Sequence, residues 1–197
     1  MIEILAVYSA FGVKVSDEVY KKIKLKAEED IPVSLIFGLF TTVVRHQKLP
    51  SWPEDIHGCT GYWNSFYEPL TKKQIISHLQ TLSYNTTHYD NRKNHFPNLI
   101  QHDALSHIDI SFMLLPKYII EAETGFMPEK KEYFNNQFYG LIVDGAEGRA
   151  TYLPEVFPNV SWDYIKRSVL NKASINNGKF YAYKTIVIRC PIFESLF

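Results

Sequence analysis

The chain has 197 residues, of which 46% are hydrophobic and 15% aromatic, and its 21 lysines and arginines are balanced by 21 aspartates and glutamates. This composition is typical of an ordered globular protein with a hydrophobic core and argues against long disordered stretches. The zero net charge gives no broad attraction to phosphate backbones or anionic lipids, so we expect no nucleic acid partner.

Cysteine content and hydrophobic segments indicate the cellular compartment. Two cysteines, Cys59 and Cys190, are too few for a disulfide framework, which favours a reducing environment. The opening segment, residues 1–12, is mildly apolar but lacks the basic start of a secretion signal, and we interpret it as a buried strand. The longest apolar run, Val33 to Val44, is too short to cross a bilayer. We therefore expect a protein of the cytoplasm or nucleus with no membrane span.

The first helix is predicted from Ser16 to Glu29. Ser16 is a good N-cap, and Val19, Ile23 and Ala27 recur every four residues on one helix face. The run "KKIKLK" is balanced by "EED", which indicates a solvated helix face rather than a nucleic acid contact.

A buried strand and a second helix are predicted next. "VSLIFGLFTTVV" is apolar on both faces, as in a strand inside a sheet. Thr71 and Gln74 have the spacing of a capping box, so a helix begins there with Ile75, Ile76, Leu79 and Leu82 on one face. The polar stretch "SYNTTHYDNRKNHFPN" that follows predicts a surface loop.

The sequence of the second half of the chain predicts several strands and one helix. "HIDISFMLLP" alternates apolar and polar residues like a half-buried strand, and "FYGLIV" and "RATYL" flank the turn "DGAEG" like the arms of a hairpin. A helix is predicted from Ser161 to Ala173, and "KFYAYKTIVIRC" predicts a closing strand. We therefore predict an α+β fold with a largely antiparallel central sheet flanked by helices; no regular βαβ alternation or phosphate loop favours a doubly wound fold.

One short stretch, "DIHGCTGYW", carries the strongest chemical signal. Alternate strand residues share a face, so His57 and Cys59 are expected on one side, with Gly58 and Gly61 leaving the backbone open to another backbone or a ligand. An imidazole beside a thiol favours the thiolate, a nucleophile or metal ligand. The alternative is a small buried cysteine in a glycine-kinked strand.

The predicted hairpin suggests a second polar group of residues. Arg149 and Thr151 would share one face of the hairpin, opposite Ala150 and Tyr152, and we expect that polar face to lie in the same cleft as Cys59. The alternative is an arginine that extends from an outer sheet face to solvent.

Several histidines are of a residue type that binds metal ions. Their spacing, together with an aspartate, matches no compact metal motif, so we predict no metal site and identify no cofactor; the residues concerned are His88, Asp90, His95, His102 and His107. No motif of the common serine hydrolases, P-loop NTPases or zinc proteases is present.

Five blocks of sequence resemble a known family. "HGCTGYW", "YDNRKNHFPNLI", "LSHIDISFMLLP", "YGLIVDGAEGRATYLPEV" and "WDYIKRSVLNKA" resemble, in this order, the AMMECR domain, the family of the AMME-syndrome chromosomal-region candidate protein. We predict a single domain over residues 1–197. The resemblance is strongest over residues 37–173. Its most specific pieces are the Gly-Cys-x-Gly core and the segment from Arg149 to Val156.

The resemblance implies an α+β fold with a central antiparallel sheet and a smaller sub-domain. It also implies that the cysteine block and the Asp-x-Arg loop line a cleft. Carried over to this sequence, the candidate residues are Gly58, Cys59, Gly61, Asp90, Arg92, Arg149, Thr151, Pro154 and Glu155. The chain departs from the family pattern at His57, where the family usually has arginine, at Thr60, where it has isoleucine, and in the extra residues "KNH" after Arg92.

Two functions are compatible with these residues. In the first, the protein is an enzyme or a component of an enzyme pathway, in which Cys59 reacts, His57 or a nearby cation activates the thiol, and Asp90 orients a polar partner. Gly58, Gly61, Arg92, Arg149, Thr151 and Glu155 would then line the substrate site, with Arg149 on an anionic group. In the second, it is a non-catalytic adaptor that binds a protein or ligand through its aromatic residues from Tyr84 to Phe96 and around Trp52 and Trp63. The resemblance associates the family with Memo-like and radical SAM proteins, which are therefore candidate partners.

Overall fold

The structure is a computed structural model that describes residues 1–31, 35–46, 56–64, 67–92, 105–115, 118–120, 139–154 and 162–192. The chain forms two compact units, one made of Met1–Met113 with Ile186–Phe197 and the other of Leu114–Thr185. Each unit holds a four-stranded sheet, and every pairing with a defined register is antiparallel. The predicted α+β class, with its smaller sub-domain, is thus confirmed. The single domain expected over residues 1–197 stays a prediction.

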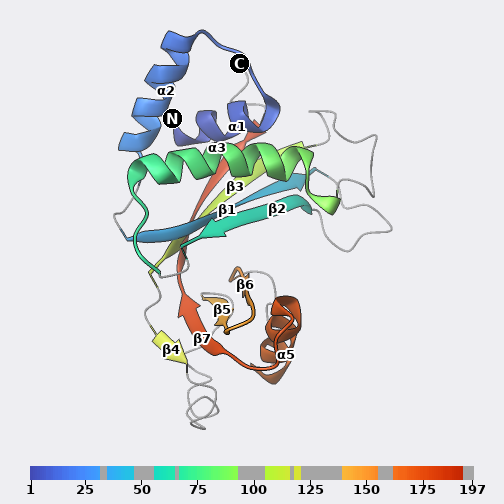
Figure 1. Ribbon diagram of the computed structural model, residues 1–197. Coiled ribbons are helices and arrows are strands. Elements are labelled where there is room, and N and C mark those ends of the chain that lie inside the picture. Colours follow the sequence, from blue (N-terminus) through green and yellow to red (C-terminus); the bar gives the residue numbers. More distant parts are fainter. Residues whose placement is uncertain are drawn as a thin grey trace. The chain divides into compact units, whose positions relative to one another are not determined.

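The larger unit combines three helices with one sheet (Figure 1). Its helices are α1 (Ile2–Phe11), α2 (Asp17–Glu29) and α3 (Lys72–His88). The sheet has the order β2-β1-β3-β8, formed by β1 (Ile36–Arg45), β2 (Ile56–Trp63), β3 (Leu105–Leu114) and β8 (Thr185–Pro191). Helix α3 packs along β1 and β2, and this contact positions the Gly-Cys-x-Gly stretch.

The predicted N-terminal strand is wrong, because residues 2–11 form helix α1. A short apolar run does not distinguish a strand from a buried helix by periodicity alone. Here Leu5, Ala6 and Ala10 are completely buried, and the helix ends at Gly12 with φ of 62°, a left-handed conformation that suits glycine.

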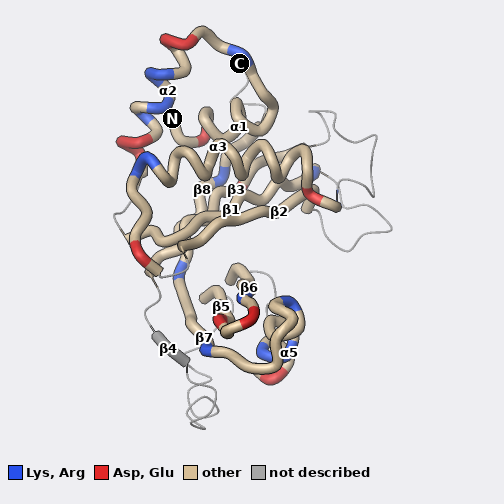
Figure 2. Tube along the Cα trace, in the orientation of Figure 1, with Lys and Arg blue, Asp and Glu red and all other residues tan. Residues whose placement is uncertain are grey.

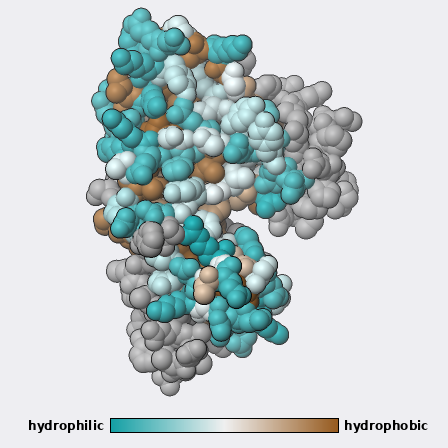
Figure 3. Space-filling view, in the orientation of Figure 1, coloured by the Kyte–Doolittle hydropathy of each residue, from teal (hydrophilic) through white to brown (hydrophobic). Residues whose placement is uncertain are grey.

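Helix α2 begins where its cap predicts. The hydroxyl of Ser16 accepts a hydrogen bond from the Val19 amide at 3.4 Å, and Lys22 and Lys26 pair with Glu18 and Glu29. Charges of both signs follow one another along this helix, and hydrophilic side chains dominate its visible surface (Figures 2 and 3). The solvated charged face is confirmed, although Val19, expected on the apolar face, is 45% exposed.

Helix α3 has the predicted capping box between Thr71 and Gln74, but it continues to His88. The loop predicted from residue 83 is therefore wrong over its first six residues. Tertiary contacts explain the difference: the side chains of Thr86 and Thr87 are completely buried, and their hydroxyl groups make hydrogen bonds inside the fold. Buried hydrogen bonds outweigh the weak helix propensity of threonine and asparagine.

Strand β3 is buried on both faces rather than on one. Asp109 and Ser111, on its polar side, are only 9% and 6% exposed. Asp109 accepts two hydrogen bonds of 2.9 Å from the guanidinium of Arg189 on β8, and His107 lies 3.5 Å away. The prediction of a half-buried strand is wrong because Arg189 of the neighbouring strand β8 supplies a partner for the Asp109 carboxylate, which allows the polar side of β3 to be buried.

The closing segment forms two strands, not one. β7 (Lys179–Tyr183) belongs to the sheet of the smaller unit, and β8 to the sheet of the larger unit. Only Lys184 separates the two strands, so the sequence shows one unbroken run of strand-forming residues.

The smaller unit has the sheet order β4-β7-β5-β6, with β4 (Tyr118–Ile120), β5 (Gly140–Asp144) and β6 (Arg149–Tyr152). The predicted hairpin of β5 and β6 is confirmed, and its turn is closed by a hydrogen bond from Gly145 N–H to the Gly148 carbonyl at 3.0 Å. Helix α5 (Trp162–Ala173), also as predicted, packs Trp162, Ile165 and Val169 onto one face of this sheet.

Candidate functional site

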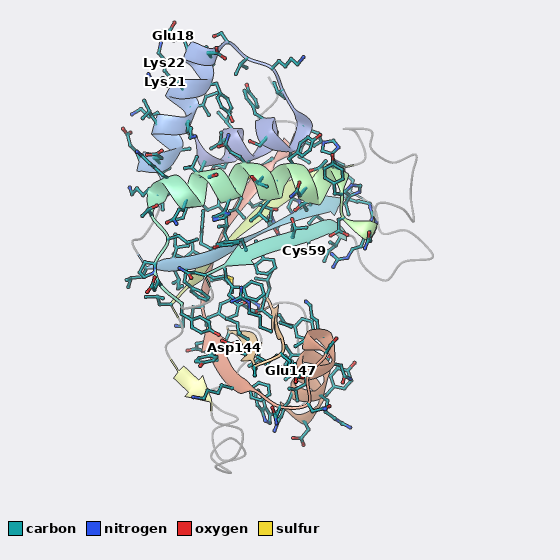
Figure 4. All side chains as sticks on the ribbon, in the orientation of Figure 1. Glu18, Lys21, Lys22, Cys59, Asp144 and Glu147 are labelled. Atoms are coloured by element: carbon teal, nitrogen blue, oxygen red, sulfur yellow. The ribbon has the colours of Figure 1, made fainter. Side chains whose placement is uncertain are left out.

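The stretch around Cys59 lies on β2, at the edge of the larger sheet (Figure 4). In the antiparallel pair of β1 and β2, Thr42 is opposite Cys59 and Val43 is opposite Gly58, but Val44 is opposite Ile56. His57 is therefore the extra residue of a β-bulge. A bulge interrupts the alternation of side chains along a strand.

The bulge sends His57 and Cys59 in different directions. Nε2 of His57, a completely buried residue, lies 3.2 Å from the carbonyl oxygen of Thr87 in α3. The sulfur of Cys59 instead accepts a hydrogen bond from the hydroxyl of Thr42 at 3.3 Å.

The neighbouring residues identify these two sides of the sheet. Thr41 and Thr60 both turn to α3, where their hydroxyl groups meet that of Thr86. Cys59 and Thr42 are next to them in sequence and therefore face away from this helix. The prediction that His57 and Cys59 share one face is wrong, because sequence alternation does not reveal a bulge.

The structure explains both glycines of the motif by contacts within the chain. A side chain at position 58 would collide with the carbonyl oxygen of Thr86, and its Cβ would lie 3.0 Å from the Cβ of Asp90. A side chain at position 61 would collide with the ring of Phe40. The predicted close approach of another backbone is confirmed for Gly58, where helix α3 lies directly on β2.

Asp90 connects the end of α3 to the cysteine. One carboxylate oxygen accepts the Cys59 N–H at 2.9 Å, and the other accepts the Arg92 N–H at 2.9 Å. The side chain of Asp90 is only 10% exposed. These bonds hold the backbone of Cys59 at the sheet edge, so Asp90 acts on the position of the cysteine rather than on its sulfur.

Arg92 lies next to this carboxylate with part of its hydrogen-bonding capacity unused. Its Nε is 3.9 Å from Asp90 Oδ1, which is too long for a hydrogen bond. Its Nη1 is buried and has no hydrogen-bond partner within the described part of the chain, while the side chain as a whole is 35% exposed.

The two cysteines have different surroundings. Cys59 is partly exposed, whereas Cys190 is completely buried in β8. Burial raises the pKa of the Cys190 thiol far above its usual range, and the charges of Glu3 and Asp109 act in the same direction. The alternative of a fully buried Cys59 is therefore wrong. Cys59 is the more accessible of the two thiols.

The remaining predicted site residues belong to the smaller unit. Arg149 and Thr151 lie on one face of the hairpin, as predicted, while Ala150 on the other face packs against α5. Thr151 is buried, and its hydroxyl donates to the Leu141 carbonyl at 2.9 Å and lies 2.9 Å from the hydroxyl of Tyr183. A site shared by this face and Cys59 stays a prediction, and Glu155 lies outside the described residues.

The described side chains contain no cluster of three or more His, Cys, Asp or Glu residues that could hold a metal ion. Nε2 of His88 instead donates a hydrogen bond to the Ala10 carbonyl oxygen at 2.9 Å, and its ring contacts that of Tyr84. His95 and His102 lie outside the described residues. Among the helices that the structure describes, none has the length and apolar character needed to span a membrane.

Thr42, the hydroxyl donor to the Cys59 sulfur, is a site residue that the sequence does not predict. Two buried strands separated by a turn-rich segment do indicate a hairpin, and a hairpin places one residue of β1 opposite Cys59. The bulge at His57 shifts the register, however, so the sequence alone does not identify which residue that is.

Comparisons with known proteins agree with this fold. The model of the AMMECR1 family matches residues 10–193. A solved structure of the uncharacterized protein PH0010 from Pyrococcus horikoshii is similar with a TM-score of 0.61 and 20% sequence identity, over 96% of this chain and 95% of that chain. No curated protein matches the chain.

Proposed function

The chain belongs to the AMMECR1 family, and from that membership and the geometry around β2 we propose that it is an enzyme, or a component of an enzyme pathway, that uses the thiol of Cys59. The observation that carries this proposal is the setting of the sulfur. It is partly exposed, it accepts a hydrogen bond from Thr42, and the backbone that bears it is held by Asp90.

A hydrogen bond donated to sulfur stabilises the thiolate, which is the nucleophilic form of cysteine. Thr42 therefore takes the activating role that the sequence suggested for His57. His57, completely buried and bonded to α3, keeps a structural role in this proposal. Asp90 positions the Cys59 amide and also accepts the backbone amide of Arg92.

The proposal is tested by the pH dependence of alkylation. In a Cys190→Ser background, the rate of reaction with iodoacetamide at increasing pH gives the thiol pKa of Cys59 in the folded protein. We expect a pKa below about 8.5, the ordinary thiol value. A pKa at or above that value would contradict a role as nucleophile.

A second candidate function is supported by exposed aromatic rings. Tyr84 and Tyr89, at the end of α3, are 41% and 69% exposed, and their rings lie 5.8 Å apart. Exposed tyrosines are frequent in protein interfaces. On this basis the protein is an adaptor that binds a partner through the end of α3, and Memo-like or radical SAM proteins are the partners to test first.

One pair of variants separates the two functions. Cys59→Ser removes the thiol and leaves the tyrosines, whereas Tyr89→Ala does the reverse. If the protein is a thiol enzyme, only Cys59→Ser fails to complement loss of the gene; if it is an adaptor, only Tyr89→Ala fails. Thermal unfolding of both variants serves as the control for folding.

A further inference from the structure

We infer that Ser106 on β3 is a nucleophile that accepts acyl groups from carboxylic esters, with His107 as its general base. Asp109 and Arg189 position the imidazole. This site does not depend on the thiol of Cys59 and uses other strands of the larger sheet. Three of the four residues stand in the short stretch "SHID", which is no motif of the common serine hydrolases. Such sites are recognised by geometry and roles rather than by sequence position.

The hydroxyl of Ser106 meets the imidazole of the next residue. Its Oγ lies 2.9 Å from Nδ1 of His107. A nucleophile and its general base lie within this hydrogen-bonding distance of each other. Both side chains are only partly buried, so a small molecule can reach the hydroxyl.

The carboxylate of Asp109 favours one protonation state of this imidazole. Nε2 of His107 lies 3.5 Å from Oδ2 of Asp109, which is the distance of an ion pair rather than of a short hydrogen bond. A negative charge on this side favours the tautomer with its proton on Nε2. Nδ1 is then the unprotonated nitrogen, so it accepts from the Ser106 hydroxyl and can take its proton.

Arg189 holds the carboxylate in place. Its Nε and Nη2 donate to the two oxygens of Asp109, each at 2.9 Å, in a bidentate pair. Asp109 is only 9% exposed, and a charge acts more strongly on its neighbours where water is excluded. Asp109 and Arg189 are therefore positioning residues that act on Ser106 through the imidazole.

The proposed reaction needs only these groups, the ester and water. Oγ of Ser106 forms a bond to the carbonyl carbon of the ester while its proton goes to Nδ1 of His107. The alcohol leaves with that proton, and a water molecule then releases the carboxylic acid and restores the hydroxyl. Esters are the expected acyl donors because an alcohol leaves more readily than the amine of an amide.

A fluorophosphonate probe tests the nucleophile directly. Oγ of the reacting serine forms a bond to phosphorus, fluoride leaves, and the hydroxyl proton goes to the base. We expect peptide mass spectrometry of the folded protein to find the label on Ser106, and Ser106→Ala to abolish it. Ser168→Ala is the matched control and should keep the labelling rate. The hydroxyl of Ser168 is also partly buried and lies 3.0 Å from another side chain, but that partner is the phenol of Tyr152 rather than an imidazole.

Two further variants test the base and its positioning. His107→Gln should lower the labelling rate roughly 100-fold, at the low end of what general base catalysis contributes. Asp109→Asn keeps the shape but removes the charge, so labelling should slow. The pH of half-maximal rate should also fall, because the lost carboxylate stabilises the protonated imidazole. Thermal unfolding of each variant serves as the control for folding.

Three results would contradict this inference. Absence of label on Ser106 in the folded parent protein would show that the four side chains are only a structural cluster. An unchanged labelling rate in folded His107→Gln would exclude the imidazole as base. Slower labelling in Asp109→Asn at an unchanged pH of half-maximal rate would refute the positioning role of the carboxylate.

Discussion

Gly58 in β2 and Thr86 in α3 pack backbone against backbone, so closely that the Thr86 carbonyl oxygen occupies the place of a side chain at position 58. The helix is held there by its hydroxyl contacts to the sheet, since Thr86 meets Thr41 at 2.7 Å and also contacts Thr60. The glycine is therefore required by the position of α3 on the sheet.

Gly58→Ala is expected to lower the free energy of unfolding by about 1–3 kcal/mol, the usual cost of an overpacked site. The atom in the way belongs to the helix backbone, which cannot rotate aside. Gly61→Ala is the comparison, because the obstacle there is the ring of Phe40, a side chain that can move. Urea denaturation of both variants measures the difference. Equal stability of Gly58→Ala and the parent protein would show that α3 does not press on β2.

Thr42→Val is expected to slow the alkylation of Cys59 at neutral pH roughly 2- to 10-fold, which corresponds to the loss of one hydrogen bond. The hydroxyl of Thr42 donates to the sulfur at 3.3 Å, and valine has nearly the same shape without the donor. Thr42→Ser restores the hydroxyl and should restore the rate. Thr41→Val is the control on the adjacent residue, which faces α3; if it slows the reaction as much as Thr42→Val does, the effect comes from the fold and not from the hydrogen bond.

Arg189→Ala is expected to lower the free energy of unfolding by about 1–2 kcal/mol, because it leaves the carboxylate of Asp109 without its two charge-assisted hydrogen bonds. Asp109 has a side chain only 12% exposed, so water replaces the lost partner poorly. Lys22→Ala provides the contrast. It breaks a pair with Glu18 in which both side chains are more than 70% exposed, and such pairs contribute little. Chemical denaturation that gave the same loss for both variants would contradict this account of burial.

The buried thiol of Cys190 predicts a loss of stability at alkaline pH. Burial holds the pKa of this thiol above its usual range in the folded protein, while in the unfolded chain it ionises near pH 8.5. Its contribution to stability is therefore complete below that pH and declines as the pH rises further, by at most about 1.4 kcal/mol per pH unit. The free energy of unfolding should thus fall less between pH 7 and 10 in Cys190→Ala than in the parent protein. Parallel curves for the two proteins would refute the prediction.

Local sequence signals were sufficient for several elements. The caps of Ser16 and Thr71 determine where α2 and α3 begin, because these side chains satisfy amides only a few residues away. The same is true of the hairpin around "DGAEG", whose turn closes between Gly145 and Gly148. The family resemblance was also readable from the order of the sequence blocks.

The rest depends on contacts between distant residues. Burial against other elements decided whether residues 2–11 form a helix or a strand, and whether residues 83–88 continue a helix. The local propensities of these residues for helix and for other conformations differ little, and tertiary packing outweighs the difference.

The candidate site shows the same division. From sequence alone came the identity of its residues, among them Cys59, Asp90 and Arg92. Only the tertiary structure decided their arrangement: one extra residue at His57 turned the imidazole to α3 and paired the thiol with Thr42. Register and bulges are set by the pairing of two strands and the helix above them, and no single stretch of sequence contains that information.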